Sequence, residues 1–383
     1  MKRFVIFSIM FCILATTFCA SMQPAVFAAA EVDLASKSAC LVDFSSGQVL
    51  YQKDATLHLP VASMVKMMTI LLTLEEYQKG NLTDETMIET TENASSMGGS
   101  QVFIDPYVQY SAKDMLKSVI MASANDASVA LAEHISGSED NFVVKMNERA
   151  KQLGMNDTNY VNCTGLPAPE QYSCAKDSAI VLKEVSKFDK YHQFSTIWMD
   201  ELVHPSGRKT ELVNTNRLVR YYEGCDGGKT GSTNEAGCCL AATAKRNNMR
   251  LISVVIGAKN SQTRFNECSK LFNYGFANFE NKSLLDSTCA IKSLAVSKGK
   301  VDSAEIYACE DYSVTSKKGE QNEFEIDYIL PEKLSAPTKA GDIVGKAVVS
   351  KGGVVVKEID LTVKNDIEPL SLKDCFEKIA YSW

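Results

Sequence analysis

The segment 63–79 constrains the fold more than any other part of the chain. It is rich in Met, Leu and Lys, which favour helix, and Gly80 follows it as a C-cap residue would. Residues 64–74 are apolar on nearly every face of such a helix. Because a helix without a polar face belongs in the interior of a domain, the sequence predicts a buried central helix. The same pattern places Ser63 and Lys66 on one face, at the N-terminus of that helix.

Strand and helix signals on both sides of this segment indicate how it is enclosed. Capping residues and glycines delimit further helices. Two pairs of apolar strands, each joined by a short turn, lie at the two ends of the region 38–279. The strands are expected at 38–44, 48–52, 238–245 and 250–258, and the helices at 111–121, 125–137, 139–153 and 264–279. This order favours an α/β (α+β) domain over residues 31–280, with an antiparallel sheet flanked by helices.

The pattern changes at about residue 283 to short strands alone. Residues 324–328 and 358–363 alternate apolar with polar, and glycines punctuate the segments between them. We expect a small all-β sandwich domain over 283–366, followed by a short tail, 367–383. Four apolar residues recur in the tail at helical spacing: Leu372, Phe376, Ile379 and Trp383. Peripheral membrane contact through this amphipathic tail and simple packing on the β-domain both stay open.

The N-terminus has the pattern of a secretory signal over residues 1–30. Lys2 and Arg3 precede an apolar run, 4–20, and Ala28 to Ala30 offer a cleavage site. An uncleaved membrane anchor is the alternative, although the run is short for one. We therefore expect an exported protein that acts outside the cytoplasm, at the cell wall or the outer face of the cytoplasmic membrane.

Charge and residue usage exclude some classes of partner. The net charge of −7, without a basic stripe, argues against nucleic acid. The four histidines have no ligand spacing, so no metal site is predicted. The ten cysteines beyond the signal form no small-domain disulfide framework. We expect them to be mainly buried free thiols, although an exported protein could pair them.

Three short clusters carry the chemistry: Ser63-Met64-Val65-Lys66, Ser123-Ala124-Asn125 and Lys229-Thr230-Gly231. A serine hydroxyl needs a neighbouring base, and a lysine serves only if burial or a nearby like charge lowers its pKa. For Lys66, the apolar helix would supply the burial and Lys229 could supply the like charge. Taken singly, the clusters could be a helix cap, a turn and a basic loop, and both the S-x-x-K and S-x-N patterns recur elsewhere in the chain. The clusters are expected at a helix start, a helix break and a glycine-flanked strand edge. This placement and their order along the chain favour a single acyl-transfer site.

The chain resembles the low-molecular-mass penicillin-binding proteins of the D-alanyl-D-alanine carboxypeptidase family. S-x-x-K, S-D-N and K-T-G are the signature of these proteins and of class A β-lactamases. Further segments extend the likeness over nearly all of the chain beyond residue 30: 62–69, 99–103, 123–127, 162–166, 226–231 and 235–237. The resemblance implies a β-lactamase/transpeptidase-like fold and a serine-type carboxypeptidase that removes the terminal D-alanine from peptidoglycan stem peptides.

The resemblance also implies a role for each residue of the site. Ser63 would be the acylated nucleophile, Lys66 its general base and Ser123 the proton relay to the leaving D-alanine. Asn125 would bind the substrate amide and Lys66. The terminal carboxylate would be bound by Lys229, Thr230 and, less directly, Arg264. Gly231 belongs to the same strand edge, where a glycine lets a substrate backbone approach closely. The backbone N–H groups of Ser63 and Ser232 would form the oxyanion hole. No cofactor is expected, and β-lactam antibiotics would be acylating inhibitors.

Some features depart from the family pattern or leave alternatives open. The middle triplet is Ser-Ala-Asn, and Cys174 replaces the Thr of a common Ser-Thr-Ala-x-Asp motif. A β-lactamase on the same scaffold is a second hypothesis, but the chain lacks the E-x-x-L-N stretch that supplies a deacylating glutamate in class A enzymes. A catalytically weak, wall-associated binding protein is a third. The balance between carboxypeptidase activity and endopeptidase activity on cross-links also stays open.

Overall fold

The computed structural model describes residues 32–320 and 323–374. The expected signal, 1–30, and residues 375–383 of the expected tail lie outside this part. Within it, no helix is both long and apolar enough to cross a membrane. The described residues from Leu34 onwards belong to one compact unit.

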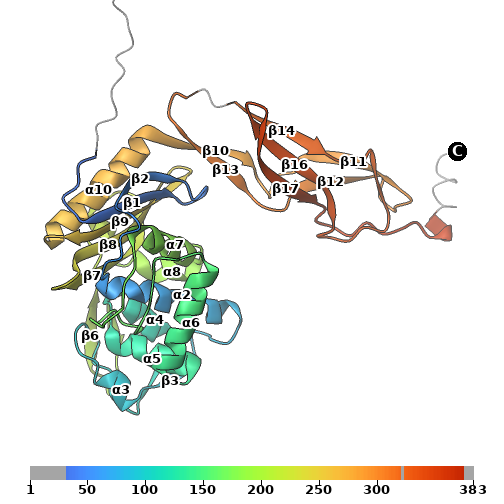
Figure 1. The fold of residues 1–383 in the computed structure, drawn as a ribbon. Coiled ribbons are helices and arrows are strands. Elements are labelled where there is room, and N and C mark those ends of the chain that lie inside the picture. Colours follow the sequence, from blue (N-terminus) through green and yellow to red (C-terminus); the bar gives the residue numbers. More distant parts are fainter. Residues whose placement is uncertain (1–31, 321–322, 375–383) are drawn as a thin grey trace, which may run out of the picture. The chain divides into compact units, whose positions relative to one another are not determined.

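A five-stranded antiparallel sheet organises the first part of the chain (Figure 1). Its strand order is β2-β1-β9-β8-β7. The strands are β1 (Ser38–Asp43), β2 (Val49–Lys53), β7 (Cys225–Thr233), β8 (Gly237–Arg246) and β9 (Met249–Ala258). The expected hairpins are therefore present, and Asn247 takes the left-handed conformation (φ 51°) that the tight β8–β9 turn requires. β7, which carries Lys229, lies at an edge of the sheet.

Helices cover both faces of this sheet (Figure 1). On one face lies α10 (Ser261–Asn278), where Gly275 lets the helix approach Leu41 and Leu251 closely. The helix begins three residues earlier than expected, because the Asn260 side chain accepts a hydrogen bond from the Thr263 N–H and caps it. On the other face, α7 (Ala175–Val185) packs against β1, β8 and β9.

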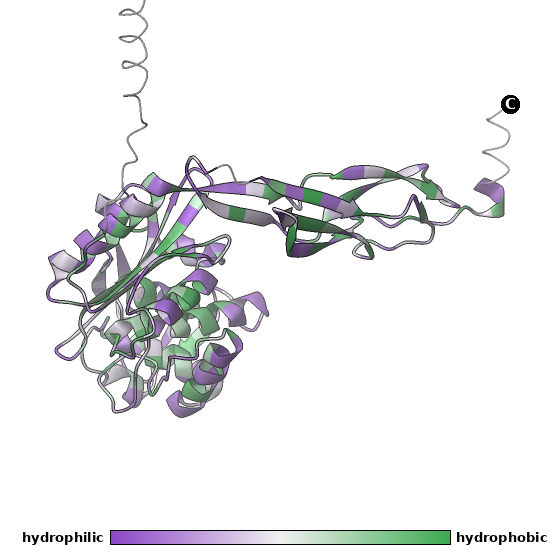
Figure 2. Ribbon diagram, turned by 45° about the horizontal axis from the view of Figure 1, so that its top comes forward, coloured by the Kyte–Doolittle hydropathy of each residue, from purple (hydrophilic) through white to green (hydrophobic). Residues whose placement is uncertain are grey.

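The predicted central helix is confirmed. It begins with a 3₁₀ turn, η1 (Ala62–Val65), and continues as α2 (Lys66–Gln78), which is buried at every residue from 66 to 74. Around it lie α4 (Ala112–Met121), α5 (Asn125–Ser136) and α6 (Glu139–Gln152). Ser111 caps α4 as expected, by accepting from the Asp114 N–H. Figure 2 shows hydrophobic residues concentrated in this helical layer, where the larger of two core clusters lies.

No helix or strand was predicted for residues 186–224. This stretch forms α8 (Asp189–Ser195), the hairpin β5 (Met199–Val203) and β6 (Lys209–Val213), and a single turn, α9 (Leu218–Tyr221). Short elements also lie before α4: β3 (Met87–Glu89), α3 (Glu92–Ser95) and β4 (Gln109–Ser111).

From Phe279 to Thr362 the named elements of the described chain are all strands, as expected, and they have a hydrophobic core of their own. A six-stranded sheet has the order β14-β16-β17-β12-β11-β15, and β10 pairs with β13. Hydrophobic and hydrophilic residues alternate along these strands (Figure 2). The strands are β10 (Phe279–Leu285), β11 (Lys292–Ser297), β12 (Ser303–Ala308), β13 (Tyr312–Lys317), β14 (Phe324–Ile329), β15 (Lys333–Ser335), β16 (Ile343–Lys351) and β17 (Val354–Thr362).

The cysteines of the described residues are free thiols. Six are buried, Cys238 is half-buried, and Cys289 and Cys309 are exposed. Cys238 and the fully buried Cys239 are neighbours on β8 and differ in exposure because successive side chains of a strand point to opposite faces.

Candidate active site

Ser63 and Lys66 meet at the junction of η1 and α2. The Lys66 Nζ lies 3.0 Å from the Ser63 Oγ and donates to the Thr164 carbonyl oxygen at 2.5 Å. Ser63 is half-buried, whereas Lys66 is completely buried. The lysine is therefore held against the hydroxyl from which a base would take a proton. Among the described residues, neither side chain has a carboxylate as a hydrogen-bond partner.

Burial lowers the pKa of Lys66 to about 7, and the nearby Cys163 and Asp126 offset part of this effect. The all-apolar helix thus provides the desolvation that the sequence predicted. The second expected cause, a like charge from Lys229, is not among those that lower the pKa of Lys66. The charge of Lys66 instead acts on Lys229: burial first, and then Lys66 and Arg264, hold the pKa of Lys229 well below its usual range.

Ser123 lies at the break between α4 and α5. Its backbone is in the left-handed region (φ 62°), which costs a residue with a side chain about 1–3 kcal/mol. Its hydroxyl accepts from the Lys229 Nζ at 2.7 Å. Lys229 is only 1% exposed and also donates to the Thr230 carbonyl oxygen. The ammonium therefore lies behind Ser123, and not in the cleft wall where a carboxylate would bind.

Asn125 opens α5 beside Ser123. Its Nδ2 donates to the Gly98 carbonyl oxygen at 2.6 Å, and its backbone N–H donates to the Ser100 carbonyl oxygen. Its Oδ1 is buried and has no hydrogen-bond partner among the described residues. An unpaired buried acceptor suits the expected contact with a substrate amide. The structure does not, however, join Asn125 to Lys66 by a hydrogen bond.

The edge of β7 packs directly on the turn that carries Ser63. A Cβ on Gly231 would lie 2.4 Å from the Val61 carbonyl oxygen, and one on Gly165 would lie 2.1 Å from that of Ala62. Two glycines thus hold the 61–64 backbone from different segments. The glycine of the third cluster was expected to admit a substrate backbone, but the space it leaves is taken by η1.

Packing also explains the glycines that precede Lys229. The Tyr191 ring lies against Gly227, and its hydroxyl oxygen accepts from the Gly228 N–H at 2.8 Å. Gly228 has a φ of 144° and lies against the backbone of β8. These residues fix the start of β7, and with it the positions of Lys229 and Thr230.

Arg264 reaches the site from α10. It is 8% exposed, and its Nη1 donates to the Gly231 carbonyl oxygen at 3.0 Å and to the Ser232 Oγ at 2.9 Å. Its Nε is buried without a partner among the described residues. A guanidinium with a free donor beside the strand edge is suited to bind a carboxylate.

A cleft of about 670 Å³ joins these residues. Its wall includes four residues of the three clusters, Ser63, Ser123, Thr230 and Gly231. Ser232 and Arg264 line it as well. Lys66, Asn125 and Lys229 do not line this cleft but contact residues close to it. The structure therefore brings together all nine predicted site residues. It adds one acceptor that sequence reasoning missed, the Thr164 carbonyl oxygen, although residues 162–166 were among those carrying the resemblance.

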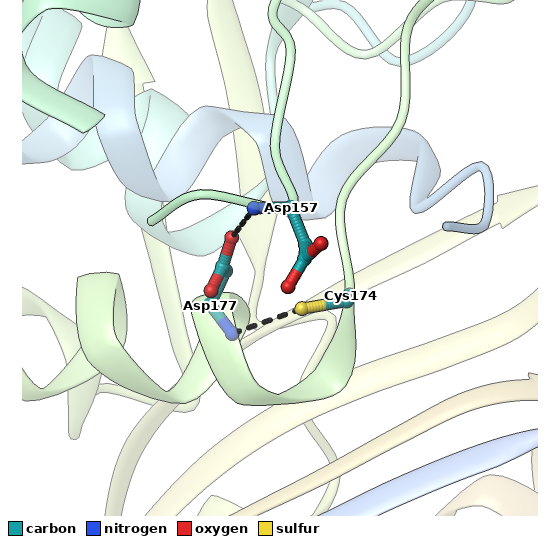
Figure 3. A group of neighbouring side chains, drawn as sticks. All are labelled: Asp157, Cys174 and Asp177. Carbon is teal, nitrogen blue, oxygen red and sulfur yellow. Dashed lines mark hydrogen bonds between the residues drawn. The ribbon is translucent and has the colours of Figure 1, made fainter. Parts of the chain in front are cut away.

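A second polar cluster lies at the start of α7, away from this cleft (Figure 3). Potential ligand atoms of Asp157, Cys174 and Asp177 lie within 4.8 Å of one another. Cys174 caps the helix by accepting from the Asp177 N–H, and Asp177 accepts from the Asp157 N–H and the Thr158 hydroxyl. These contacts give the cluster a structural role in fixing the loop to the helix. The prediction of no metal site stays a prediction.

Comparisons with known proteins place the chain in a family. Residues 25–260 match the family described as D-alanyl-D-alanine carboxypeptidase, and residues 279–369 match the C-terminal domain of penicillin-binding protein 5. D-alanyl-D-alanine carboxypeptidase DacF of Bacillus subtilis (strain 168) is 40% identical over 349 residues, which cover 91% of this chain and 90% of the relative.

Two solved structures are similar as well. Penicillin-binding protein 5 of Haemophilus influenzae has a TM-score of 0.70 and 33% identity, covering 88% of this chain and 98% of its own. Penicillin-binding protein D2 of Listeria monocytogenes, in its ampicillin-bound form, has a TM-score of 0.58 and 28% identity. The match covers 64% of this chain and 99% of the Listeria protein.

Proposed function

This chain belongs to the D-alanyl-D-alanine carboxypeptidase family and is a serine-type carboxypeptidase, and we propose that Ser63 is the residue it acylates. The contact between the Lys66 Nζ and the Ser63 Oγ at 3.0 Å carries this proposal. A lysine with a pKa of about 7 is neutral in a large fraction of molecules near neutral pH and can then accept the serine proton. The substrate we propose is the D-Ala-D-Ala end of a peptidoglycan stem peptide.

The remaining roles follow from where each side chain lies. Ser63 attacks the carbonyl carbon of the penultimate D-alanine, and the backbone N–H groups of Ser63 and Ser232 stabilise the oxyanion. Support for this oxyanion hole comes from the close packing of β7 on η1. Ser123 passes a proton to the leaving amine, and Asn125 binds the substrate amide.

The terminal carboxylate would be bound by the Thr230 hydroxyl and the Arg264 guanidinium, which line the cleft. Lys229 was expected to share this task. Because its ammonium is buried behind Ser123, we assign it instead to positioning the Ser123 hydroxyl and supplying protons to it.

Penicillin would acylate the same serine and stay bound. A β-lactamase needs a group that activates the deacylating water, and no carboxylate is hydrogen-bonded to Ser63 or Lys66 among the described residues. The Listeria relative was solved in its ampicillin-bound form, so a protein of similar fold binds a penicillin. We therefore favour the carboxypeptidase over the β-lactamase hypothesis for this site.

Labelling with a fluorescent penicillin tests the proposal. The wild-type protein should be labelled on Ser63, as shown by mass spectrometry of the peptide, and should release D-alanine from a D-Ala-D-Ala peptide. Ser63→Ala should abolish both reactions while keeping the unfolding transition of the wild type. D-alanine release by Ser63→Ala at the wild-type rate would disprove the assignment, and rapid turnover of a chromogenic cephalosporin would favour the β-lactamase instead.

We also propose that residues 1–30 direct export and are removed. The basic residues and apolar run at the N-terminus support this, and so does a peptidoglycan substrate, which lies outside the cytoplasm. The proposed domains are then 31–280 for catalysis, 283–366 for the β-domain and 367–383 for the tail. Peripheral membrane contact through the tail is part of this proposal, which N-terminal sequencing and fractionation of the exported protein would test.

A further inference from the structure

The Thr164 carbonyl oxygen determines how the base faces the nucleophile. A carbonyl oxygen can only accept, so the Lys66 Nζ donates to it, at 2.5 Å. When Lys66 is neutral, this bond fixes the rotation of the amine and leaves its lone pair free to accept from the Ser63 hydroxyl, 3.0 Å away. Once Lys66 has taken the proton, the same oxygen stabilises the ammonium. The geometry of the base therefore depends on the loop that carries Thr164.

That loop is held from two sides at the residue before Thr164. From α2, the Thr69 hydroxyl donates to the Cys163 carbonyl oxygen at 2.7 Å. From α6, the Glu139 Oε1 accepts from the Cys163 N–H at 3.0 Å. Cys163 is fully buried, so its backbone groups have no access to water as an alternative partner. Both of them have a partner outside the loop, which fixes the chain one residue before the Thr164 carbonyl.

Glu139 is the first residue of α6, and its carboxylate reaches out of the helix to the loop. Ser138 already caps the helix by accepting from the Asn141 N–H, so the helix does not need Glu139 as a cap. Further along α6, the Asn147 side chain binds both the N–H and the carbonyl oxygen of Tyr160. The loop is thus tied to α6 at two points, and Glu139 makes the tie that lies next to Thr164.

The Cys163 thiol gives Glu139 a second contact. Burial, and then the charge of Glu139 and a hydrogen bond to it, hold the pKa of this thiol well above its usual range. The thiol is therefore neutral at physiological pH. A thiolate at this position would raise the pKa of Lys66. The carboxylate thus holds both the backbone and the side chain of Cys163 in a state that suits a neutral base.

We propose that Glu139 is a positioning residue for Lys66: its carboxylate holds the Cys163 backbone, and thereby the Thr164 carbonyl oxygen, in the place from which that oxygen orients the base. The proposal rests on the roles of Ser63 and Lys66 proposed above. Glu139 does not line the cleft, and no printed hydrogen bond or ion pair of the described chain joins it to Ser63 or Lys66. It acts on the base only through the loop.

Glu139→Ala removes the carboxylate and tests the proposal in acylation by penicillin, followed by stopped flow from pH 5 to 9. The rate on the high-pH plateau should fall about tenfold or more, since a shift of about 1 Å in a catalytic group costs about 100-fold. The midpoint of the profile should also move to lower pH by about half a unit, because the ammonium loses part of a hydrogen bond. Glu139→Gln keeps an acceptor without its charge, so both effects should be smaller.

Asp140→Ala is the matched control. Asp140 also lies in the first turn of α6, but it is exposed, and its side chain makes no hydrogen bond or ion pair within the described part of the chain. It should keep the wild-type plateau and midpoint. Equal changes in Asp140→Ala and Glu139→Ala would overturn the proposal, because they would assign the effect to the charge at the helix end.

Equilibrium urea unfolding separates positioning from a purely structural role. A folded Glu139→Ala protein that is less stable but has the wild-type plateau and midpoint would overturn the proposal, because Glu139 would then serve the fold alone. If Glu139→Ala does not fold, Glu139→Gln decides in the same way: the proposal fails if its plateau and midpoint are those of the wild type.

Failure of the proposed function would be seen separately. Mass spectrometry should find penicillin on Ser63 in the wild type and in all three variants. A label on another residue would contradict the Ser63 assignment, whereas a label on Ser63 with identical pH profiles would contradict the role of Glu139 alone.

Discussion

Two buried ammonium groups determine the chemistry of the site at the scale of single residues. Lys66 contacts the hydroxyl that would attack, and Lys229 contacts the hydroxyl that would return the proton. Both pKa values are lowered chiefly because burial disfavours the charged form. Each lysine therefore serves one serine, so the site has two Ser–Lys pairs in place of a histidine.

The pH dependence of acylation tests the role of Lys66. Since the base must be neutral, the rate of acylation by penicillin should rise about tenfold per pH unit below pH 7 and level off above it. Lys66→Arg should lose this profile and nearly all of the rate, because an arginine does not give up its proton. Stopped-flow measurement from pH 5 to 9 gives the profile. A rate that stays flat between pH 5 and 7 would contradict Lys66 as the base.

At the scale of elements, the position of the nucleophile depends on two glycines that belong to neither η1 nor α2. Gly165 and Gly231 press on the backbone of residues 61–64 from a loop and from β7. Gly165 has a φ of 80°. A side chain there would therefore add backbone strain as well as a contact too short to exist.

Gly165→Ala should displace Ser63 and slow acylation by penicillin about 100-fold, the cost of a shift of about 1 Å in a catalytic group. Gly154→Ala is the control, because Gly154 has a similar φ of 74° but nothing within 4 Å of an added Cβ. It should lose about 1 kcal/mol of unfolding free energy and keep its acylation rate. Acylation kinetics combined with denaturant unfolding separate the two effects, and equal acylation rates would show that Gly165 does not position the nucleophile.

The cap of α7 provides a second test at this scale (Figure 3). Cys174 accepts from the Asp177 N–H at 3.3 Å, but a thiol is a weak acceptor. Cys174→Ser should raise the unfolding free energy by about 0.5–1 kcal/mol, since serine is a favoured cap, whereas Cys174→Ala should lower it. Equilibrium urea unfolding of the three proteins gives the order. A serine variant less stable than the alanine variant would show that the thiol is retained for its packing.

At the scale of the whole molecule, the described residues include two hydrophobic core clusters that share no residue. One lies between residues 40 and 256 and the other between 285 and 367. All nine residues of the proposed site belong to the part of the chain with the first core. The Listeria relative, matched over nearly its full length by 64% of this chain, shows that a similar fold exists with fewer residues.

A protein that begins at residue 31 and ends at Asn278, the last residue of α10, should therefore fold and be labelled by fluorescent penicillin. Its acylation rate should lie within about threefold of that of the longer protein, because no side chain of the cleft wall is lost. Thermal unfolding followed by circular dichroism shows whether it folds. A truncated protein that folds but is not labelled would mean that the β-domain contributes to the site.

The sequence by itself determined the parts that depend on local pattern. The apolar run after Ser63, the Ser111 cap and the Asn247-Asn248 turn predicted a buried helix, a helix start and a hairpin, because each depends on neighbours a few residues away. The order of the three clusters predicted the site, and the resemblance assigned their roles.

Only the tertiary structure decided how the site is enclosed. It buried Lys229 behind Ser123, placed Gly231 against η1 and brought the Thr164 carbonyl oxygen to Lys66. It also made Arg217 and some of its neighbours part of the cleft wall. These features join residues about 100 positions apart, such as Lys66 and Thr164, and no periodicity within a segment carries information on such contacts. They arise because the sheet and the central helix bring distant loops to one edge.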